Sequence, residues 1–189
     1  MNNAVKTRPL SPSSLEDFLR FFDGDAFRDN PEWSSCYCQC FYEDHTRIAW
    51  STRTAAENRA AACARIDAKL MRGYLAYVGG RVVGWCNAAP RNLLHALDQD
   101  PIENADRVGV IVCFLTAPQF RNQGIASALL SAACEGLRSE GMQFAEANPR
   151  PDALGAAANH FGPLHMYLAA GFAVDRADSD GSVWVRKKL

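Results

Sequence analysis

One apolar run limits what this chain can fold into more than any other feature. Most side chains from Val108 to Thr116 are hydrophobic, and the run has the length of a strand, too short to cross a bilayer as a helix. A strand that is apolar on both of its sides is typical of a sheet that is covered on both faces. Pro118 follows and ends the strand because proline cannot donate a ladder hydrogen bond. The run therefore predicts a buried strand inside a sheet flanked by helices.

Helical and strand-like patterns alternate along the rest of the chain. Amphipathic spacing predicts helices near 15–22, 52–72, 125–140 and 161–168, and β-like composition predicts strands near 1–10, 74–78, 81–87, 142–147, 172–176 and 182–187. The two strands around Gly79-Gly80 form the clearest hairpin. Interleaving of this kind indicates an α/β or α+β fold with a mixed sheet. The length of 189 residues fits a single domain over 1–189.

Charge and cysteine content restrict the partners that we expect. The formal net charge is −1, and the one short basic cluster is Arg186-Lys187-Lys188, so a nucleic-acid surface is not expected. The N-terminus lacks the pattern of a signal peptide, and no apolar run is long enough for a membrane span. We therefore expect a cytoplasmic protein with seven reduced cysteines, either a monomer or a homodimer.

The junction between the apolar strand and the next helix is a candidate anion site. A helix N-terminus carries unpaired N–H groups and a partial positive charge. The residues expected to contact an anion here are Arg121, Asn122, Gln123, Gly124, Ile125, Ala126 and Ser127. Neither a Walker A loop nor a G-x-G-x-x-G dinucleotide fingerprint is present. These residues alone leave a plain helix start with a surface arginine as the alternative.

Two segments resemble motifs of the GNAT acetyltransferase superfamily. The sequence from Leu115 to Ala126, LTAPQFRNQGIA, resembles its acetyl-CoA-binding motif, in which a buried strand ends in V-x-P-x-x-R/Q-x-x-G-x-G/A and opens a helix. Thr116 stands at the valine position of that motif. The sequence from Met166 to Phe172, MYLAAGF, resembles the later Y-x-x-x-G-F segment. The resemblance covers roughly residues 73–188 and implies a six- or seven-stranded mixed sheet that splays apart beside the Val108–Thr116 strand.

The resemblance also implies an activity. It implies an N-acetyltransferase that takes acetyl-CoA as co-substrate, needs no metal, and transfers the acetyl group to an amine of a small molecule by direct attack in a ternary complex. The backbone of Phe114, Leu115 and Thr116 would hold the pantetheine arm, and an N–H near Leu115 would polarise the thioester carbonyl. The loop from Arg121 to Ser127 would hold the pyrophosphate. The alternative is a non-catalytic GNAT-like domain that binds acyl-CoA as a sensor or interaction module.

Two residues are the candidates for proton transfer. Tyr167 lies four residues before Gly171, where many members of the superfamily keep the tyrosine that protonates the departing sulfur. The alternative for Tyr167 is a core aromatic on an amphipathic helix. Glu146, in the strand after the cofactor-binding helix, is the candidate general base. Glu103 and Asp106 are alternatives, and a water chain would replace all three.

An aromatic, cysteine-rich section spans residues 27–50. It contains Cys36-Tyr37-Cys38-Gln39-Cys40, but no second Cys/His pair with zinc spacing follows, which favours buried thiols over a metal site. Trp33 to Tyr42 is similar to a stretch found ahead of the domain in a subset of bacterial GNAT-like proteins, and this implies a place beside the acceptor cleft. Further candidates for acceptor contacts are Trp85, Asn87, Arg91, His160 and His165.

Overall fold

A mixed sheet forms the centre of the computed structural model, which describes residues 4–151, 155, 159–177 and 181–189. Within these residues the strands follow the order β1-β2-β3-β4-β5-β7-β6. Their bounds are Lys6–Pro9 (β1), Tyr74–Val78 (β2), Arg81–Pro90 (β3), Val108–Thr116 (β4), Phe144–Ala147 (β5), Ala173–Ala177 (β6) and Val183–Lys188 (β7). Strands β4 and β5 pair in parallel and the other neighbours are antiparallel. The predicted six- or seven-stranded mixed sheet is confirmed, with seven strands among the described residues.

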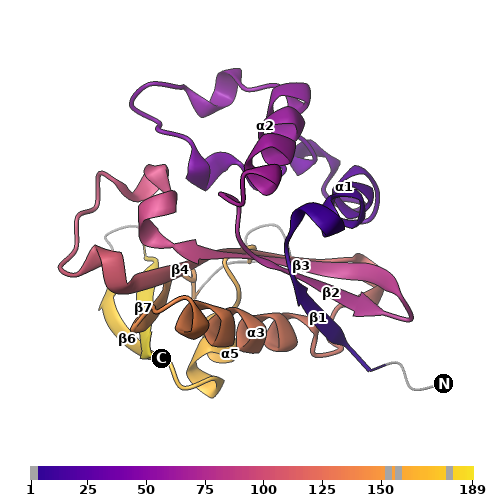
Figure 1. The fold of residues 1–189 in the computed structure, drawn as a ribbon. Helices are drawn as coiled ribbons and strands as arrows, with labels where there is room; N and C mark the ends of the chain where they lie inside the picture. Colours follow the sequence, from indigo (N-terminus) through magenta and orange to yellow (C-terminus); the bar gives the residue numbers. More distant parts are fainter. Residues whose placement is uncertain (1–3, 152–154, 156–158, 178–180) are drawn as a thin grey trace.

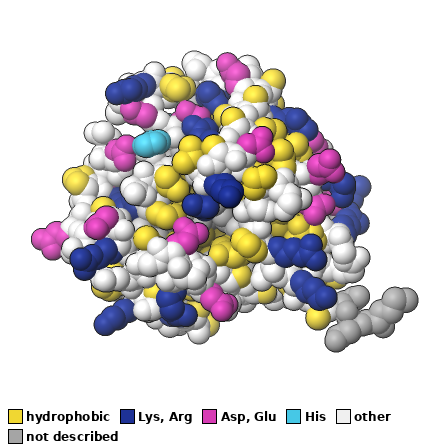
Figure 2. All heavy atoms as spheres, in the orientation of Figure 1, with side chains coloured by type: hydrophobic (Ala, Val, Ile, Leu, Met, Phe, Trp, Pro, Cys, Tyr) yellow, Lys and Arg dark blue, Asp and Glu magenta, His cyan; other side chains and the backbone are white. Residues whose placement is uncertain are grey.

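Helices cover both faces of the sheet. They are α1 (Leu15–Asp23), α2 (Ala55–Asp67), α3 (Ile125–Ser139) and α5 (Leu164–Ala169). Helices α1 and α2 lie on one face, and α3 and α5 lie on the other (Figure 1). None of the described helices has the length and apolar character that a bilayer span needs. On the face in Figure 2, described Lys and Arg side chains are interspersed with Asp and Glu.

Helix α2 is shorter than the predicted 52–72. The Thr54 hydroxyl accepts from the Glu57 N–H at 3.2 Å, and the Glu57 carboxylate accepts from the Thr54 N–H at 2.8 Å. This reciprocal capping box fixes the first turn at Ala55. The expected start at residue 52 was wrong because the cap, rather than the composition, sets the boundary.

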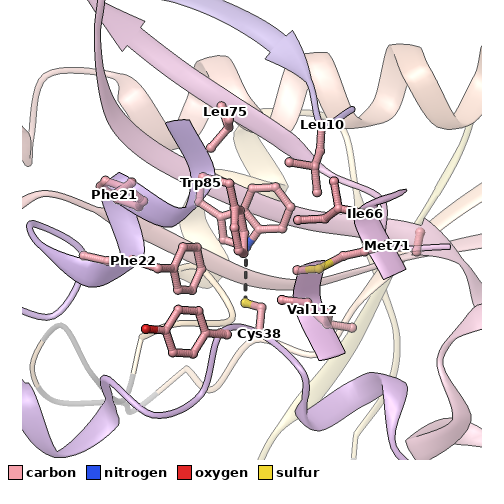
Figure 3. Packing of buried hydrophobic residues seen from close by; sticks show 14 of the residues in the cluster. Leu10, Phe21, Phe22, Cys38, Ile66, Met71, Leu75, Trp85 and Val112 are labelled. Carbon is pink, nitrogen blue, oxygen red and sulfur yellow. Dashed lines mark hydrogen bonds between the residues drawn. The ribbon is translucent and has the colours of Figure 1, made fainter. Parts of the chain in front are cut away.

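Trp85 of β3 is the centre of the core beneath α1 and α2 (Figure 3). Its ring is fully buried and meets Phe18 edge-to-face, with the ring centroids 5.2 Å apart. Its indole Nε1 donates to the Cys38 Sγ at 3.2 Å, which gives the buried N–H a partner. Trp85 thereby fastens the cysteine-rich section to the sheet.

That section, between α1 and α2, consists of turns. Short 3-10 helices span Pro31–Trp33, Cys40–Tyr42 and Trp50–Thr52, and Tyr37 and Cys38 have positive φ angles of 43° and 54°. The backbone is therefore not an extended strand at Cys36, Cys38 and Cys40. All seven cysteines are free thiols.

Helix α3 packs closely against the opposite face of the sheet. Ile125, Leu129 and Leu137 of its predicted apolar stripe are buried. A methyl group on Gly84 of β3 would lie 2.7 Å from the Ile125 side chain, so glycine permits the close approach. The approach sets the start of α3 directly against the sheet.

Strand β4 contains a β-bulge. Asn87 of β3 pairs with Cys113 while the next residue, Ala88, pairs with Ile111, so Val112 is an extra residue on β4. A bulge bends its strand and changes which side chains share a face. Accordingly Ile111 and Phe114 belong to the core under α3, while Val112 belongs to the core under α1 and α2.

Candidate active site

Strand β4 has an open edge over its second half. Its parallel pairing with β5 covers Val108 to Ile111, whereas its pairing with β3 continues to Thr116. The bulge at Val112 lies where β5 ends, and beyond it β4 and β5 diverge. The structure thus has the splay expected beside this strand.

The backbone N–H groups of β4 alternate between β3 and the open edge. The Phe114 N–H donates away from β3, to the His160 carbonyl at 2.6 Å, while the Ala117 N–H donates to Val83 of β3 at 2.9 Å. Because successive strand residues point their N–H groups to opposite sides, Thr116 also faces the open edge and Leu115 faces β3. A thioester carbonyl at this edge would therefore meet the N–H of Phe114 or Thr116, the residues that flank Leu115.

A cavity of about 550 Å³ extends from this edge to the start of α3. We call it the helix-end cavity. Its lining residues are Ala26, Phe27, Asn30, Trp33, Phe114, Leu115, Thr116, Phe120, Arg121, Asn122, Gly124, Ile125, Ala126, Ser127, Asn159, His160, Gly162, Pro163, His165 and Met166. Every predicted cofactor residue except Gln123 is among them. The Gln123 side chain instead donates to the Gln119 carbonyl at 3.0 Å.

The end of α3 is shaped for an anion. Gly124 precedes the helix with a φ of 78°, and no side chain caps the helix. A methyl group on Gly124 would have no atom within 4 Å, so the backbone is open to the cavity. The first N–H groups of a helix have no acceptor within the helix, and the helix dipole favours negative charge there. A phosphate-sized anion suits this end.

Arg121 is engaged by a carboxylate of the same chain. Its guanidinium makes two hydrogen bonds to Asp29, of which the one from Nη2 to Oδ1 measures 3.0 Å. These bonds hold the pKa of Asp29 below its usual value. Asp29 lies between α1 and α2, so a segment remote in sequence supplies a carboxylate beside the expected phosphate position.

A second cavity, of about 430 Å³, lies on the α1 and α2 side of β4. We call it the aromatic cavity. Its lining residues are Phe27, Glu32, Trp33, Ser35, Cys36, Cys38, Cys40, Phe41, Trp50, Asn87, Val112, Cys113, Leu115, His160 and Phe161. Four residues line both cavities, namely Phe27, Trp33, Leu115 and His160. The two cavities therefore meet at the open edge of β4.

Tyr167 lies behind the helix-end cavity. Its side chain is fully buried and its hydroxyl donates to the Phe161 carbonyl at 2.6 Å. Burial raises the pKa of Tyr167 well above its ordinary value. The hydroxyl group lines neither cavity, but the ring packs edge-on against Phe114, which does, with the centroids 6.3 Å apart.

Glu146 lies apart from both cavities. Its side chain is 1% exposed on β5, 3.0 Å from the Arg186 guanidinium and 3.8 Å from that of Arg91. Burial raises the pKa of Glu146 against the opposing effect of these guanidinium groups. Glu103 and Asp106 are exposed and line neither cavity. The predicted base is thus not brought to the open edge, and its role stays a prediction without geometric support.

The remaining acceptor candidates divide into those that line a cavity and those, Trp85 and Arg91, that line neither. Asn87 lines the aromatic cavity, His165 lines the helix-end cavity and His160 lines both. Arg91 is 4% exposed, lines neither cavity and bonds to the Asp100 carboxylate at 3.0 Å. Phe27 and Asn30 line the helix-end cavity but were not predicted as site residues. An aromatic section predicts buried rings, but it does not predict which of its side chains face a cavity.

The cysteine-rich section holds no candidate metal cluster within the described residues. Burial raises the pKa of Cys36 to about 12 and that of Cys40 to about 11. The thiols of these two residues are therefore protonated at neutral pH.

Comparison with known proteins agrees with the fold. A sequence model of the acetyltransferase (GNAT) family matches residues 29–172. A ribosomal-protein-alanine N-acetyltransferase from Brucella melitensis superimposes with a TM-score of 0.59 at 16% identity, over 97% of this chain and 99% of that chain. An N-acetyltransferase from Staphylococcus aureus Mu50 gives 0.61 at 13% identity, over 98% of each chain.

A third similar structure contains the cofactor without its acyl group. The PaiA N-acetyltransferase from Thermoplasma acidophilum, solved in complex with coenzyme A, gives a TM-score of 0.58 at 13% identity, over 98% of this chain and 99% of that chain. No curated protein sequence matches the chain significantly. At these identities the solved structures establish the fold, and the family match covers most of the chain. The protein is therefore an acyltransferase that belongs to the acetyltransferase (GNAT) family.

Proposed function

We propose that the protein transfers an acetyl group from acetyl-CoA to an amine of a small molecule, by direct attack within a ternary complex. The observation that carries this proposal is the meeting of two cavities at the open edge of β4, with Leu115 and His160 in both walls. A donor in one cavity and an acceptor in the other would place their reacting atoms at this edge. Direct attack requires that proximity.

The helix-end cavity would hold the donor. The pyrophosphate would lie at the start of α3, near Arg121 and Ser127, where the N–H groups and the dipole favour an anion. The pantetheine arm would follow the backbone of Phe114 to Thr116. The Phe114 N–H would have to exchange the His160 carbonyl for a group of the donor.

The chemistry would then proceed in one attack. The amine nitrogen uses its lone pair to attack the thioester carbon, the carbon–sulfur bond breaks, and the sulfur leaves with the bonding electrons. A backbone N–H at the open edge would stabilise the oxyanion. Tyr167, whose ring packs against Phe114 of the helix-end cavity, would protonate the sulfur, and its hydroxyl would have to exchange the Phe161 carbonyl for that sulfur. The proton of the attacking amine would leave to a base or to water.

Thiol release from acetyl-CoA in the presence of a panel of amines tests the activity. Release that depends on both the protein and an amine, together with a mass increase of one acetyl group on that amine, is expected. Binding of CoA without release across a broad panel would instead favour an acyl-CoA sensor.

Replacing Asp29 with asparagine should tighten CoA binding by up to about fivefold. The ion pair with Arg121 is partly exposed, with side-chain exposures of 39% and 32%, and such pairs contribute about 0–1 kcal/mol. Removing the Asp29 charge frees the guanidinium for phosphate and removes a repulsion. Titration calorimetry with CoA measures the change. Asp25→Asn, which breaks the pair with Arg81 outside both cavities, is the control, and weaker binding in Asp29→Asn than in this control would contradict the proposed phosphate position.

Replacing Glu146 with glutamine should leave kcat within about threefold, because its carboxylate lies 3.0 Å from the Arg186 guanidinium and 3.8 Å from that of Arg91, and neither arginine lines a cavity. Steady-state kinetics at saturating acetyl-CoA measures this. Glu140→Gln, whose carboxylate is 3.9 Å from Arg72 at the surface, is the matched control. A loss of about 10²–10⁴ in kcat, the usual size for a missing general base, would assign that role to Glu146.

A further inference from the structure

The walls of the aromatic cavity are largely apolar. Five aromatic side chains line it, and they come from two regions that are far apart in the sequence: Phe27, Trp33, Phe41, Trp50 and Phe161. Phe41 and Phe161 meet edge-to-face with centroids 6.0 Å apart, which brings the two regions together. Val112 and Leu115 of β4 complete the apolar surface. A ligand body that fills this space gains most from apolar contact.

Charge in the aromatic cavity is limited to one sign. Among its described lining residues Glu32 is the one that carries a formal charge, and none is a lysine or an arginine. The neighbouring thiols of Cys36 and Cys40 stay protonated at neutral pH because burial raises their pKa. A carboxylate or phosphate on the acceptor would lose its hydration without gaining a lysine or arginine partner, and the imidazole among the described lining residues, that of His160, lies where the two cavities meet. An ammonium group can meet Glu32 or the ring faces of Trp33 and Trp50.

Among the described lining residues, the polar side chains available for hydroxyl recognition are few, namely those of Glu32, Ser35, Asn87 and His160. The Asn87 side chain, 1% exposed, already accepts from the Tyr42 hydroxyl at 3.0 Å. A polyhydroxylated amine would bring several groups into a space with few partners for them. The volume of about 430 Å³ suits a compact body such as one ring system or a branched alkyl group.

Resting on the proposed function, we propose that the acceptor is a primary amine on an aromatic or branched aliphatic body that carries no carboxylate or phosphate. The body occupies the aromatic cavity. The nitrogen lies near Leu115 and His160, where that cavity meets the helix-end cavity. This arrangement selects the acceptor by excluding anionic groups rather than by binding a charged head group.

The decisive experiment compares amines that share a body. Thiol release is measured with 2-phenylethylamine, tryptamine and 3-methylbutylamine, with phenylalanine, and with spermidine and glucosamine. We expect kcat/KM for 2-phenylethylamine to exceed that for phenylalanine, which adds one carboxylate to the same body, by at least about a hundredfold. Preferred turnover of phenylalanine, spermidine or glucosamine would overturn the proposal while leaving acetyl transfer intact.

A substitution in the wall of the aromatic cavity tests whether the amine binds there. Phe41 lines the aromatic cavity but not the helix-end cavity, so Phe41→Ala should raise KM for 2-phenylethylamine by about tenfold or more and leave KM for acetyl-CoA unchanged. Leu70→Ala, at a 50% exposed side chain outside both cavities, is the control. An unchanged amine KM in a folded Phe41→Ala protein would contradict the assignment of this cavity.

A binding measurement separates this inference from the proposed function. Trp33 and Trp50 both line the aromatic cavity, so tryptophan fluorescence of the wild-type protein reports ligand entry without turnover. If no amine releases thiol, the proposed function fails; a fluorescence change with 2-phenylethylamine but not with phenylalanine would still support the inference. No change with 2-phenylethylamine would overturn it.

Discussion

Replacing Tyr167 with phenylalanine should lower kcat for acetyl transfer by a factor of about 10²–10⁴, the usual effect of losing a general acid. The variant removes the hydroxyl group that would protonate the departing sulfur and keeps the ring that packs against Phe114. Steady-state kinetics with acetyl-CoA and a reactive amine measures the loss. The KM for acetyl-CoA should change little, because Tyr167 lines neither cavity.

The alternative for Tyr167, a purely structural aromatic, predicts a different result. Its hydroxyl donates to the Phe161 carbonyl at 2.6 Å, and leaving that buried acceptor without a partner costs about 1–3 kcal/mol of stability. A variant that loses only stability and keeps its kcat well below the unfolding temperature would contradict the catalytic role. Tyr77→Phe is a matched control, because that hydroxyl donates to Asp17 at 3.0 Å, away from both cavities.

Replacing Gly73 with alanine should destabilise the protein by about 3–5 kcal/mol, since a main-chain conformation suited to glycine and a core clash act together. Gly73 has a φ of 148°, and its added methyl group would lie 2.3 Å from the Cys86 carbonyl oxygen and 2.4 Å from the Trp85 ring. For a protein of this size we expect the melting temperature to fall by roughly 6–20 °C. Thermal unfolding followed by circular dichroism measures the shift.

Gly141 provides the matched comparison. Its φ is 87°, but an added methyl group there has no atom within 4 Å. Gly141→Ala should therefore show the cost of the backbone conformation alone, about 1–2 kcal/mol. Equal effects of the two substitutions would show that the contact with Trp85 and Cys86 adds nothing.

Periodicity predicted the sheet and its helices well. The Val108–Thr116 strand has the predicted bounds, and Ile125, Leu129 and Leu137 are buried as their spacing requires. Such elements depend on local pattern and burial, both of which the sequence contains. Helix α2 was predicted too long at both ends, because its capping box starts the helix at Ala55 and the positive φ of 56° at Lys69 stops it from continuing to residue 72.

The site was only partly predictable. The loop from Arg121 to Ser127 could be found because its residues are contiguous, and all of them except Gln123 line the helix-end cavity. The bulge at Val112 has no signature in composition, although it decides which face of the sheet each later β4 residue meets. The surroundings of Glu146 depend on guanidinium groups from β7 and from the turn after β3. Contacts between segments that are distant in the sequence cannot be predicted from local sequence patterns.

With the donor and acceptor in the proposed positions, the contact between Arg121 and Asp29 would link the two cavities thermodynamically. A phosphate that takes Arg121 from Asp29 acts on the chain segment that also carries Phe27 and Trp33, which are walls of both cavities. Donor and acceptor affinities would then depend on one another, and thermodynamic reciprocity would require that each ligand change the affinity of the other by the same factor. One carboxylate at the surface would in this way set the cooperativity between the two substrates.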